Sequence, residues 1–278
     1  MCGRFVSARK RQELLEEFAV EHDAVGADRE PDYNVAPTKR IYAVLDNARR
    51  KDAEPGDRAP DHGTHDTASD DKSDDKAPDD HASERELRLV RWGLVPSWAK
   101  DISGGARMIN ARSETVAVKP AFRAAFARRR CLIPADGYYE WQTSGKAKLP
   151  FYIYRADGGI LAFAGIYELW RNGALPEDHA DAWYWSASII TTQATDDIGR
   201  IHDRTPMVIA PQDWTDWLDP ASNEKEHLLA TMLPATSGPG GLTSYRVRPT
   251  VNSVRNNGPD LIDPLAEPLG DTERTALF

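Results

Sequence analysis

The chain has little cysteine and no long hydrophobic run. Its 278 residues include two cysteines, Cys2 and Cys131, which cannot build a disulfide framework and lack the spacing of zinc ligands. No apolar stretch approaches the roughly 18 residues of a membrane span, and the N-terminus lacks the apolar core of a signal peptide. A glycine-rich phosphate loop is also missing, which weighs against a nucleotide-binding fold. We therefore expect a cytoplasmic protein that contacts no membrane and carries neither a metal nor another cofactor.

The acidic charge is concentrated in one part of the chain. The formal net charge is −9, but residues 51–85 alone contain 12 acidic and 5 basic side chains. The remaining sequence is close to neutral and contains local arginine clusters. An evenly acidic surface would repel nucleic acid, whereas a nearly neutral surface with arginine clusters does not. The composition therefore leaves nucleic acid open as a partner.

Residue patterns predict one α+β domain with a mainly antiparallel β core and peripheral helices. Residues 8–19 have the apolar spacing of an amphipathic helix with Ser7 as N-cap, and residues 120–129 indicate a short helix with Pro120 at its first position. Runs rich in β-branched and aromatic residues follow one another without the regular helices of a parallel sheet. We predict strands at 41–46, 86–98, 131–141, 151–156, 160–170, 183–192, 205–210 and 245–249.

The predicted domain spans residues 2–250. Residues 47–86 interrupt it with Asp, Lys, Ala, Pro, Ser and His and almost no large apolar side chain. Such a segment cannot bury enough surface to offset its ordering entropy, so we predict a disordered acidic insertion. Residues 251–278 are expected to form a C-terminal tail that wraps the surface.

Cys2 is the first residue that suggests covalent chemistry. Removal of Met1 before a residue as small as cysteine would leave an amine and a thiol on adjacent carbons, with ordinary pKa values of about 8 and about 8.5. Such a 1,2-aminothiol condenses with an aldehyde to an imine, and the thiol then closes a five-membered thiazolidine ring. The alternative interpretation is that Cys2 is simply a small buried residue near a chain end.

Three further residues could assist such a reaction. Glu140 lies among aromatic neighbours in GYYEW, where partial burial would raise its pKa and suit it to general acid–base catalysis. His202 in RIHDRTP could be a second acid or base, and Asn110 in INARSET could bind a reacting oxygen or amine. Each also has a structural interpretation: a solvent-facing strand carboxylate, a histidine paired with Asp203, and a turn or helix cap.

Arginine and tryptophan side chains in the same segments could bind nucleic acid. The guanidinium of Arg112 in INARSET could hold a phosphate. Trp92 and Trp98 in RWGLVPSW offer flat faces for base stacking, although tryptophan at a strand end is commonly part of a hydrophobic core.

In combination these segments closely resemble the SRAP family, the SOS response-associated peptidase or abasic site processing proteins. The matching segments occur in the order of the family and span residues 2–210. They are Cys2-Gly3-Arg4-Phe5, YNVAPT (33–38), RWGLVPSWAK (91–100), INARSET (109–115), CLIPADGYYEW (131–141) and IHDRTPM (201–207). The resemblance implies one α+β domain with a positively charged groove for single-stranded DNA.

The resemblance also implies an activity and a role for each matching residue. The activity is the capture of abasic sites in single-stranded DNA as a covalent crosslink during the response to DNA damage. It makes Cys2 the crosslinking nucleophile, Asn110 the residue that orients the Cys2 amine or the opened sugar, Glu140 a proton shuttle, and His202 a second acid–base group for ring opening and crosslink reversal. The residues assigned to DNA are Arg4, Arg112 and Arg204 for flanking phosphates, and Asn34, Pro37, Trp92 and Trp98 for the path of the strand.

Two minor activities and the partners follow from the same resemblance. The Cys2–Glu140 arrangement is expected to remove Met1 autocatalytically, as a peptidase and hence a hydrolase. An imine at an abasic site can also eliminate the 3′ phosphate, as a lyase. We expect a monomer that meets the replication machinery at damaged DNA and associates with the nucleoid while bound.

Two other functions fit parts of the sequence. An N-terminal-nucleophile amidohydrolase, such as a class II glutamine amidotransferase, also begins with Met-Cys-Gly and would use the Cys2 thiol against an amide. That class does not predict the INARSET, GYYEW and IHDRTP segments. A non-catalytic binder of single-stranded DNA would use tryptophan and arginine alone and would be indifferent to the loss of the Cys2 thiol.

Overall fold

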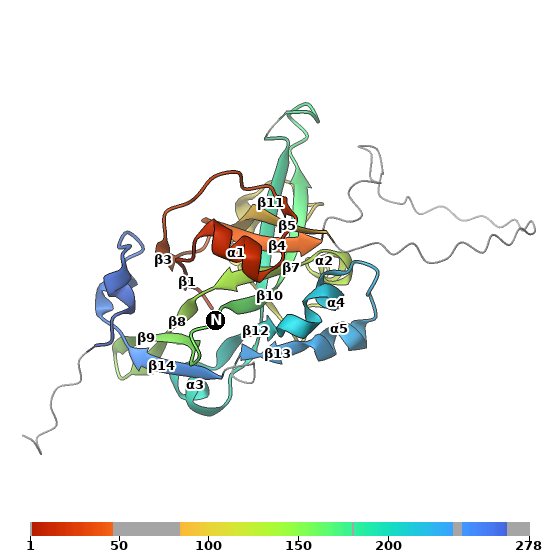
Figure 1. The fold of residues 1–278 in the computed structure, drawn as a ribbon. Coiled ribbons are helices and arrows are strands. Elements are labelled where there is room, and N and C mark those ends of the chain that lie inside the picture. Colours follow the sequence, from red (N-terminus) through yellow and green to blue (C-terminus); the bar gives the residue numbers. More distant parts are fainter. Residues whose placement is uncertain (1, 47–83, 180, 236–240, 266–278) are drawn as a thin grey trace, which may run out of the picture.

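The structure is a computed structural model that describes residues 2–46, 84–179, 181–235 and 241–265. Two β-sheets form its centre, and short helices lie around them (Figure 1). The smaller sheet has the order β14 (Leu242–Arg246), β9 (Ala147–Arg155), β8 (Gly137–Ser144), β1 (Phe5–Ser7), β3 (Asp32–Val35). The larger sheet has the order β13 (Met232–Pro234), β12 (Arg204–Ile209), β10 (Leu161–Arg171), β7 (Arg130–Ala135), β4 (Arg40–Asp46), β5 (Arg85–Trp92), β11 (Trp183–Gln193), β6 (Asn110–Arg112), with β2 (His22–Asp23) beside β5.

Pairing in both sheets is mainly antiparallel, which confirms the predicted α+β class. β11 also pairs with β10 and β12, so the larger sheet closes on itself. Parallel pairs occur where β11 meets β5 and β6 and where β2 meets β5. Within the described residues, no helix is both long and apolar enough to cross a membrane.

The helices are short and peripheral, and two begin later than the sequence patterns predict. They are α1 (Arg11–Glu17), α2 (Arg123–Arg128), α3 (Asp196–Ile201), α4 (Trp214–Leu218) and α5 (Lys225–Thr231), with 3₁₀ turns at Ser103–Arg107, Pro211–Asp213, Pro249–Asn252 and Pro259–Ile262. Ser7 is not the N-cap of α1 because it still belongs to β1; Lys10 takes that position, and its N–H donates to Glu13. Pro120 does not begin α2, because the preceding residues form turns and Phe122 becomes the N-cap.

The predicted strand at 131–141 is two strands that belong to different sheets. The chain leaves the larger sheet after β7 and enters the smaller sheet at β8, and Asp136 lies between them. The Asp136 carboxylate accepts hydrogen bonds from the Ala8 N–H (2.7 Å) and from Arg9 (3.0 Å), while its own N–H donates to the Val6 carbonyl. This junction therefore fixes β1 beside β8 at the boundary between the two sheets.

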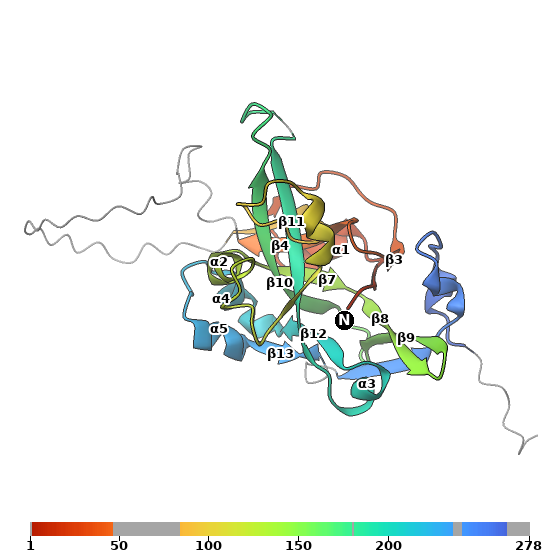
Figure 2. The same cartoon turned by 180° about the vertical axis from the view of Figure 1, so that it is seen from behind.

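The N-terminal segment lies in the hydrophobic core that these sheets share. In both views the chain before β1 runs into the middle of the molecule, among β8, β10 and β12 (Figures 1 and 2). Phe5 packs edge-to-face on Trp92 and on Phe163, with ring centroids 5.2 and 6.1 Å apart. Cys2 belongs to the same cluster and has no exposed surface. Core packing thus holds a chain end that would otherwise fray.

The folded domain includes residues on the far side of both predicted domain boundaries. β5 begins at Arg85, so the last residues of the predicted insertion 47–86 are part of a strand, and Glu86 is buried. Residues 47–83 lie outside the described residues. Beyond residue 250, Val251 and Leu261 are buried against the smaller sheet, so the chain stays packed on the domain to at least Leu265 (Figure 1, blue).

Candidate functional site

Cys2 lies where the N-terminal segment passes between β8 and β6. Its backbone carbonyl accepts a hydrogen bond of 2.8 Å from the Asn110 side-chain amide. Asn110 begins β6 and is held there by parallel pairing with Ile189 of β11. On the other side, the Tyr139 N–H of β8 donates to the Arg4 carbonyl. Burial, and then the neighbouring negative charge of Glu140, raise the pKa of the Cys2 thiol.

Glu140 is a buried carboxyl group beside Cys2. It lies in the middle of β8, paired with Phe151 of β9, and is 2% exposed. Desolvation raises its pKa to about 7, because the interior disfavours the charged form. A carboxyl group with this pKa is present in both protonation states near neutral pH, which is the condition for general acid–base catalysis.

His202 faces Glu140 from the end of α3. Its Nε2 atom is 3.9 Å from Oε2 of Glu140. The Arg204 backbone N–H donates to Nδ1 at 3.0 Å, and an Asp203 oxygen lies 2.9 Å from the same nitrogen. Burial lowers the pKa of His202 below its ordinary value, so the neutral ring dominates at pH 7. Nδ1 thus lies within reach of both the Arg204 N–H and the Asp203 carboxylate, and Nε2 is the ring nitrogen that faces Glu140.

The four residues predicted to react therefore form one group. Asn110 contacts Cys2, Cys2 is electrostatically coupled to Glu140, and Glu140 faces His202. The side-chain oxygen of Asn110 is buried without a hydrogen-bond partner among the described residues. A buried acceptor of this kind is costly unless something donates to it. The group thus has an available acceptor, a titrating carboxyl and a neutral imidazole around the Cys2 backbone.

Arg4 and Asn34, two of the residues predicted to bind DNA, are occupied by contacts within the protein. Asn34 is fully buried, and its amide nitrogen lies 3.0 Å from the carbonyl oxygens of Ser253 and Asn256. Its oxygen accepts from Arg4 at 2.6 Å, and Arg4 also donates to the Val251 carbonyl. Asn34 therefore anchors the turn at residues 249–257 and does not line the surface.

Replacing Asn34 by alanine is expected to destabilise the fold by about 2–3 kcal/mol. The substitution leaves the Arg4 guanidinium and several carbonyl groups of the 249–257 turn without their partner in a largely buried place. Urea unfolding should show the loss as a lower midpoint at unchanged slope. Asn256→Ala, which removes an exposed hydrogen bond to Thr250, is the matched control and should change stability by less than about 1 kcal/mol. Equal effects of the two variants would contradict the anchoring role.

The two tryptophans of RWGLVPSW lie in opposite environments. Trp92 is fully buried against Phe5, and its indole N–H donates to the Ile109 carbonyl at 2.9 Å. It is therefore a core residue and has no free face for a base, contrary to its predicted place on the DNA path. Trp98 is 67% exposed and keeps an open ring.

The remaining residues predicted to bind DNA differ in how free their side chains are. Arg112 is exposed at the end of β6, next to Asn110 in the same strand. Arg204 is committed to a two-point ion pair with Glu114 (2.6 and 3.1 Å) and to the Thr191 carbonyl (2.6 Å). Pro37 is half-buried. Arg112 and Trp98 are thus the exposed members of the predicted set.

Sequence reasoning missed a buried hydroxyl pair beneath the site. The Tyr138 hydroxyl lies 3.1 Å from the Thr205 hydroxyl, and both residues are fully buried. Burial raises the pKa of Tyr138, and Cys2 and Glu140 raise it further, so it stays protonated. Tyr138 could have been found from the sequence, because residues two apart on a strand share a face and Tyr138 is two residues before Glu140.

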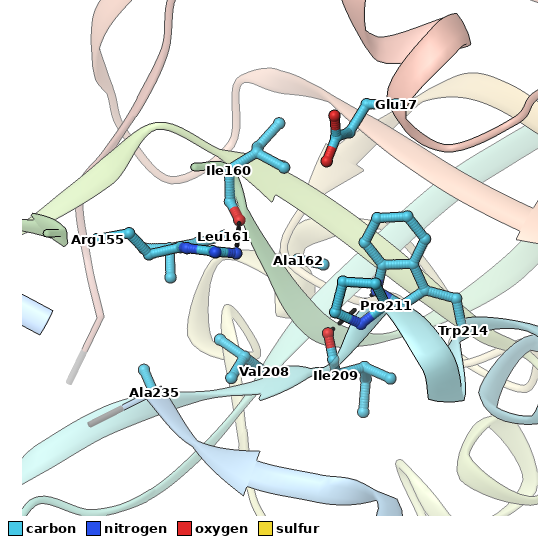
Figure 3. A pocket seen from close by; sticks show the side chains of 10 residues that line it. All are labelled: Glu17, Arg155, Ile160, Leu161, Ala162, Val208, Ile209, Pro211, Trp214 and Ala235. Carbon is cyan, nitrogen blue, oxygen red and sulfur yellow. Dashed lines mark hydrogen bonds between the residues drawn. The ribbon is translucent and has the colours of Figure 1, made fainter. Parts of the chain in front are cut away.

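A separate hollow, which none of these residues lines, lies beside β10 and β12 (Figure 3). Its lining includes the apolar residues Leu161 and Val208 and the charged residues Glu17 and Arg155. Arg155 is already engaged, because it donates to Asp157 and to the Ile160 carbonyl. Among the described residues, no group of three His, Cys, Asp or Glu side chains is placed to hold a metal ion.

Comparisons with known proteins point to one family. The family model described as SOS response associated peptidase (SRAP) matches residues 1–254. The abasic site processing protein YoaM of Bacillus subtilis is 32% identical over 264 residues, which cover 95% of this chain and 98% of YoaM. The abasic site processing protein YedK of Escherichia coli is 30% identical over 271 residues, which cover 95% of this chain and all of YedK. A crystal structure of a Bacteroides thetaiotaomicron protein matches 95% of this chain and all of its own, with a TM-score of 0.71 at 22% identity.

Proposed function

Because the chain belongs to the SOS response associated peptidase (SRAP) family, we propose that it captures abasic sites in single-stranded DNA through Cys2. The product is a thiazolidine that joins the Cys2 amine and thiol to the aldehyde carbon of the opened sugar. The observation that carries this proposal is the arrangement around Cys2: a side-chain amide bonds its carbonyl, and a buried carboxyl that titrates near pH 7 lies beside it.

Crosslink formation would proceed by a condensation and then an addition, after Met1 is removed. The α-amine of Cys2 adds to the aldehyde carbon, and the resulting hydroxyl group leaves as water to give an imine. The thiol then adds to the imine carbon, and its proton passes to the nitrogen, which closes the ring. One water is lost in total. Asn110 holds the Cys2 backbone in place while both new bonds form at neighbouring atoms.

Glu140 and His202 would move the protons. Protonated Glu140 gives its proton to the departing hydroxyl, and the carboxylate then accepts the proton of the thiol, whose pKa burial has raised. His202, whose Nε2 atom faces Glu140, would donate a proton to the ring oxygen of the abasic sugar during ring opening. The same groups in reverse would support crosslink reversal.

The peptidase and lyase activities fit the same arrangement as minor reactions. Before Met1 is removed, Glu140 would assist the attack of the Cys2 thiol on the carbonyl carbon of Met1, and water would then hydrolyse the resulting thioester. After the imine forms, elimination of the 3′ phosphate competes with ring closure. Because the thiol is adjacent to the imine nitrogen, closure is intramolecular and should keep strand cleavage low.

Trp98 is expected to contribute to DNA binding before the covalent step. Base–aromatic stacking contributes about 1–3 kcal/mol per base, so Trp98→Ala should weaken binding of an intact single-stranded oligonucleotide about 5- to 150-fold. Fluorescence anisotropy with a labelled oligonucleotide measures this affinity. Trp183→Ala is the matched control, because Trp183 is also exposed (41%) and begins β11, at the end of that strand remote from its pairing with β6. An unchanged affinity for Trp98→Ala, or an equal loss in both variants, would contradict this assignment.

The proposed function is tested by crosslinking on a denaturing gel. Protein whose Met1 removal has been verified by mass spectrometry is mixed with a single-stranded oligonucleotide that carries one abasic site. Matched oligonucleotides carry an intact base or a tetrahydrofuran residue, which lacks the aldehyde. A heat-stable shifted band that requires the aldehyde is expected. Absence of that band with a free Cys2 amine would reject the proposal, and glutamine hydrolysis would then test the amidohydrolase alternative.

A further inference from the structure

Gln142 joins the strand that carries Glu140 to the helix that precedes His202. Glu140 and Gln142 are two residues apart on β8, so their side chains project from the same face of the sheet. The side-chain amide of Gln142 donates to the Arg200 carbonyl at 3.1 Å. Arg200 lies in the last turn of α3, two residues before His202. One side chain thus bridges the two elements that carry the proposed acid–base pair.

The position of His202 depends on where α3 lies. The His202 N–H donates to the Ile198 carbonyl, so the backbone of His202 is tied to the end of that helix. α3 contains six residues, and a helix of that length is not stable without tertiary contacts. It packs against β8, and Gln142 supplies a directional contact between them. The bridge therefore limits how far α3 can shift along or away from β8.

We infer that Gln142 is a positioning residue that sets the separation of Glu140 and His202. The two side chains lie 3.9 Å apart, slightly beyond hydrogen-bond reach, so a small movement decides whether a proton can pass between them. Misplacement of a reacting group by about 1 Å can cost up to about 100-fold in rate. The inference rests on the proposed function, because it concerns the rate of the same crosslinking reaction.

Gln142→Ala is expected to slow crosslinking about three- to tenfold at saturating DNA, which is the usual effect of one partly exposed hydrogen bond. The half-saturating DNA concentration and the melting temperature should not change. Gln142→Lys keeps a donor that can reach the Arg200 carbonyl and should restore most of the rate. Ser144→Ala is the matched control: Ser144 is exposed and lies two residues after Gln142 on the same face of β8, beyond the segment that carries Glu140.

A double-mutant cycle with His202 separates positioning from a general structural role. If Gln142 acts through His202, then Gln142→Ala should cause no further loss of rate in a His202→Ala background. The inference would be overturned by an additive loss of rate in the double variant or by a lower melting temperature of Gln142→Ala. It would also be overturned if Gln142→Ala reacted at the native rate or if Gln142→Lys failed to restore the rate. Failure of the native protein to crosslink at all would instead reject the proposed function, so the two failures are distinguishable.

The pH dependence of Gln142→Lys provides a further check. The N-terminal amine, Asp203 in the adjacent position and Lys148 from β9 are the charged groups that act on the pKa of His202. Glu140 from β8 faces its Nε2 atom, and the Arg204 backbone N–H lies at Nδ1. A second lysine at position 142 adds positive charge on the β8 side, which should lower the pKa of His202 further. We expect Gln142→Lys to restore the rate and to lower the pKa of His202, which NMR titration of the histidine measures. A rescue with an unshifted titration would place residue 142 too far from His202 and contradict the inference.

Discussion

A Cys2→Ala protein with a free N-terminus is expected to lose the heat-stable crosslink completely while still forming an imine with the abasic site. The α-amine is retained, so it can condense with the aldehyde, but no thiol remains to close the ring. The imine hydrolyses on denaturation unless it is reduced. Gel analysis with and without borohydride therefore separates the two steps: the native band should appear in both lanes, and the variant band only after reduction.

Strand cleavage should move in the opposite direction in this variant. Ring closure removes the imine that permits elimination of the 3′ phosphate, so loss of the thiol should raise cleavage of the abasic strand several-fold. Native protein whose Cys2 amine is acetylated is the matched control, because its thiol is intact but its terminal nitrogen cannot condense with the aldehyde. That control should form neither imine nor crosslink through its N-terminus. A heat-stable crosslink by Cys2→Ala, or by the acetylated protein, would reject the thiazolidine.

The group of catalytic candidates could be predicted from sequence because its members lie in distinctive segments. Glu140 lies among aromatic residues that the sequence displays directly, and a carboxyl within GYYEW is expected to be desolvated, whereas His202 lies in the charged segment RIHDRTP. The structure places Glu140 near Cys2, His202 opposite Glu140, and the Asn110 side chain at the Cys2 carbonyl. Their individual roles stay predictions, since proximity alone does not assign a proton transfer.

The DNA-binding residues were harder to predict, because their environments depend on contacts that are remote in sequence. Asn34 bonds to a turn more than 210 residues away, and no local pattern reveals that partner. Trp92 and Trp98 look alike in one short segment, but β5 ends at Trp92 with its side chain on the core face. Pro96 then follows outside the strand, and Trp98 is left exposed. The predicted strand at 86–98 was therefore too long, because β5 ends at the buried Trp92 and Trp98 lies on the surface beyond it.

Glu140→Gln is expected to reduce crosslinking by about 100- to 10,000-fold, the usual contribution of a general acid–base group. The native rate should be bell-shaped, rising as the α-amine loses its proton (pKa about 8) and falling as Glu140, with a pKa of about 7, loses the proton that it gives to the departing hydroxyl. The variant should keep the rising limb and lose the falling limb. Single-turnover rates between pH 5.5 and 9 measure both effects, and an unchanged bell in Glu140→Gln would assign the falling limb to another group.

The same substitution is expected to stabilise the protein above neutral pH. Burial raises the pKa of Glu140 from 4.5 to about 7, so the folded state holds a proton that the unfolded state releases between those values. Ionisation of Glu140 then lowers the free energy of unfolding by about 3 kcal/mol. This destabilisation is absent below about pH 4.5 and complete above about pH 7. Glutamine never ionises, so Glu140→Gln should raise the urea midpoint at pH 8 and leave it nearly unchanged at pH 4.5. A variant less stable than the native protein at pH 8 would mean that the carboxylate is compensated by its neighbours, and the acid–base assignment would then lose its basis in desolvation.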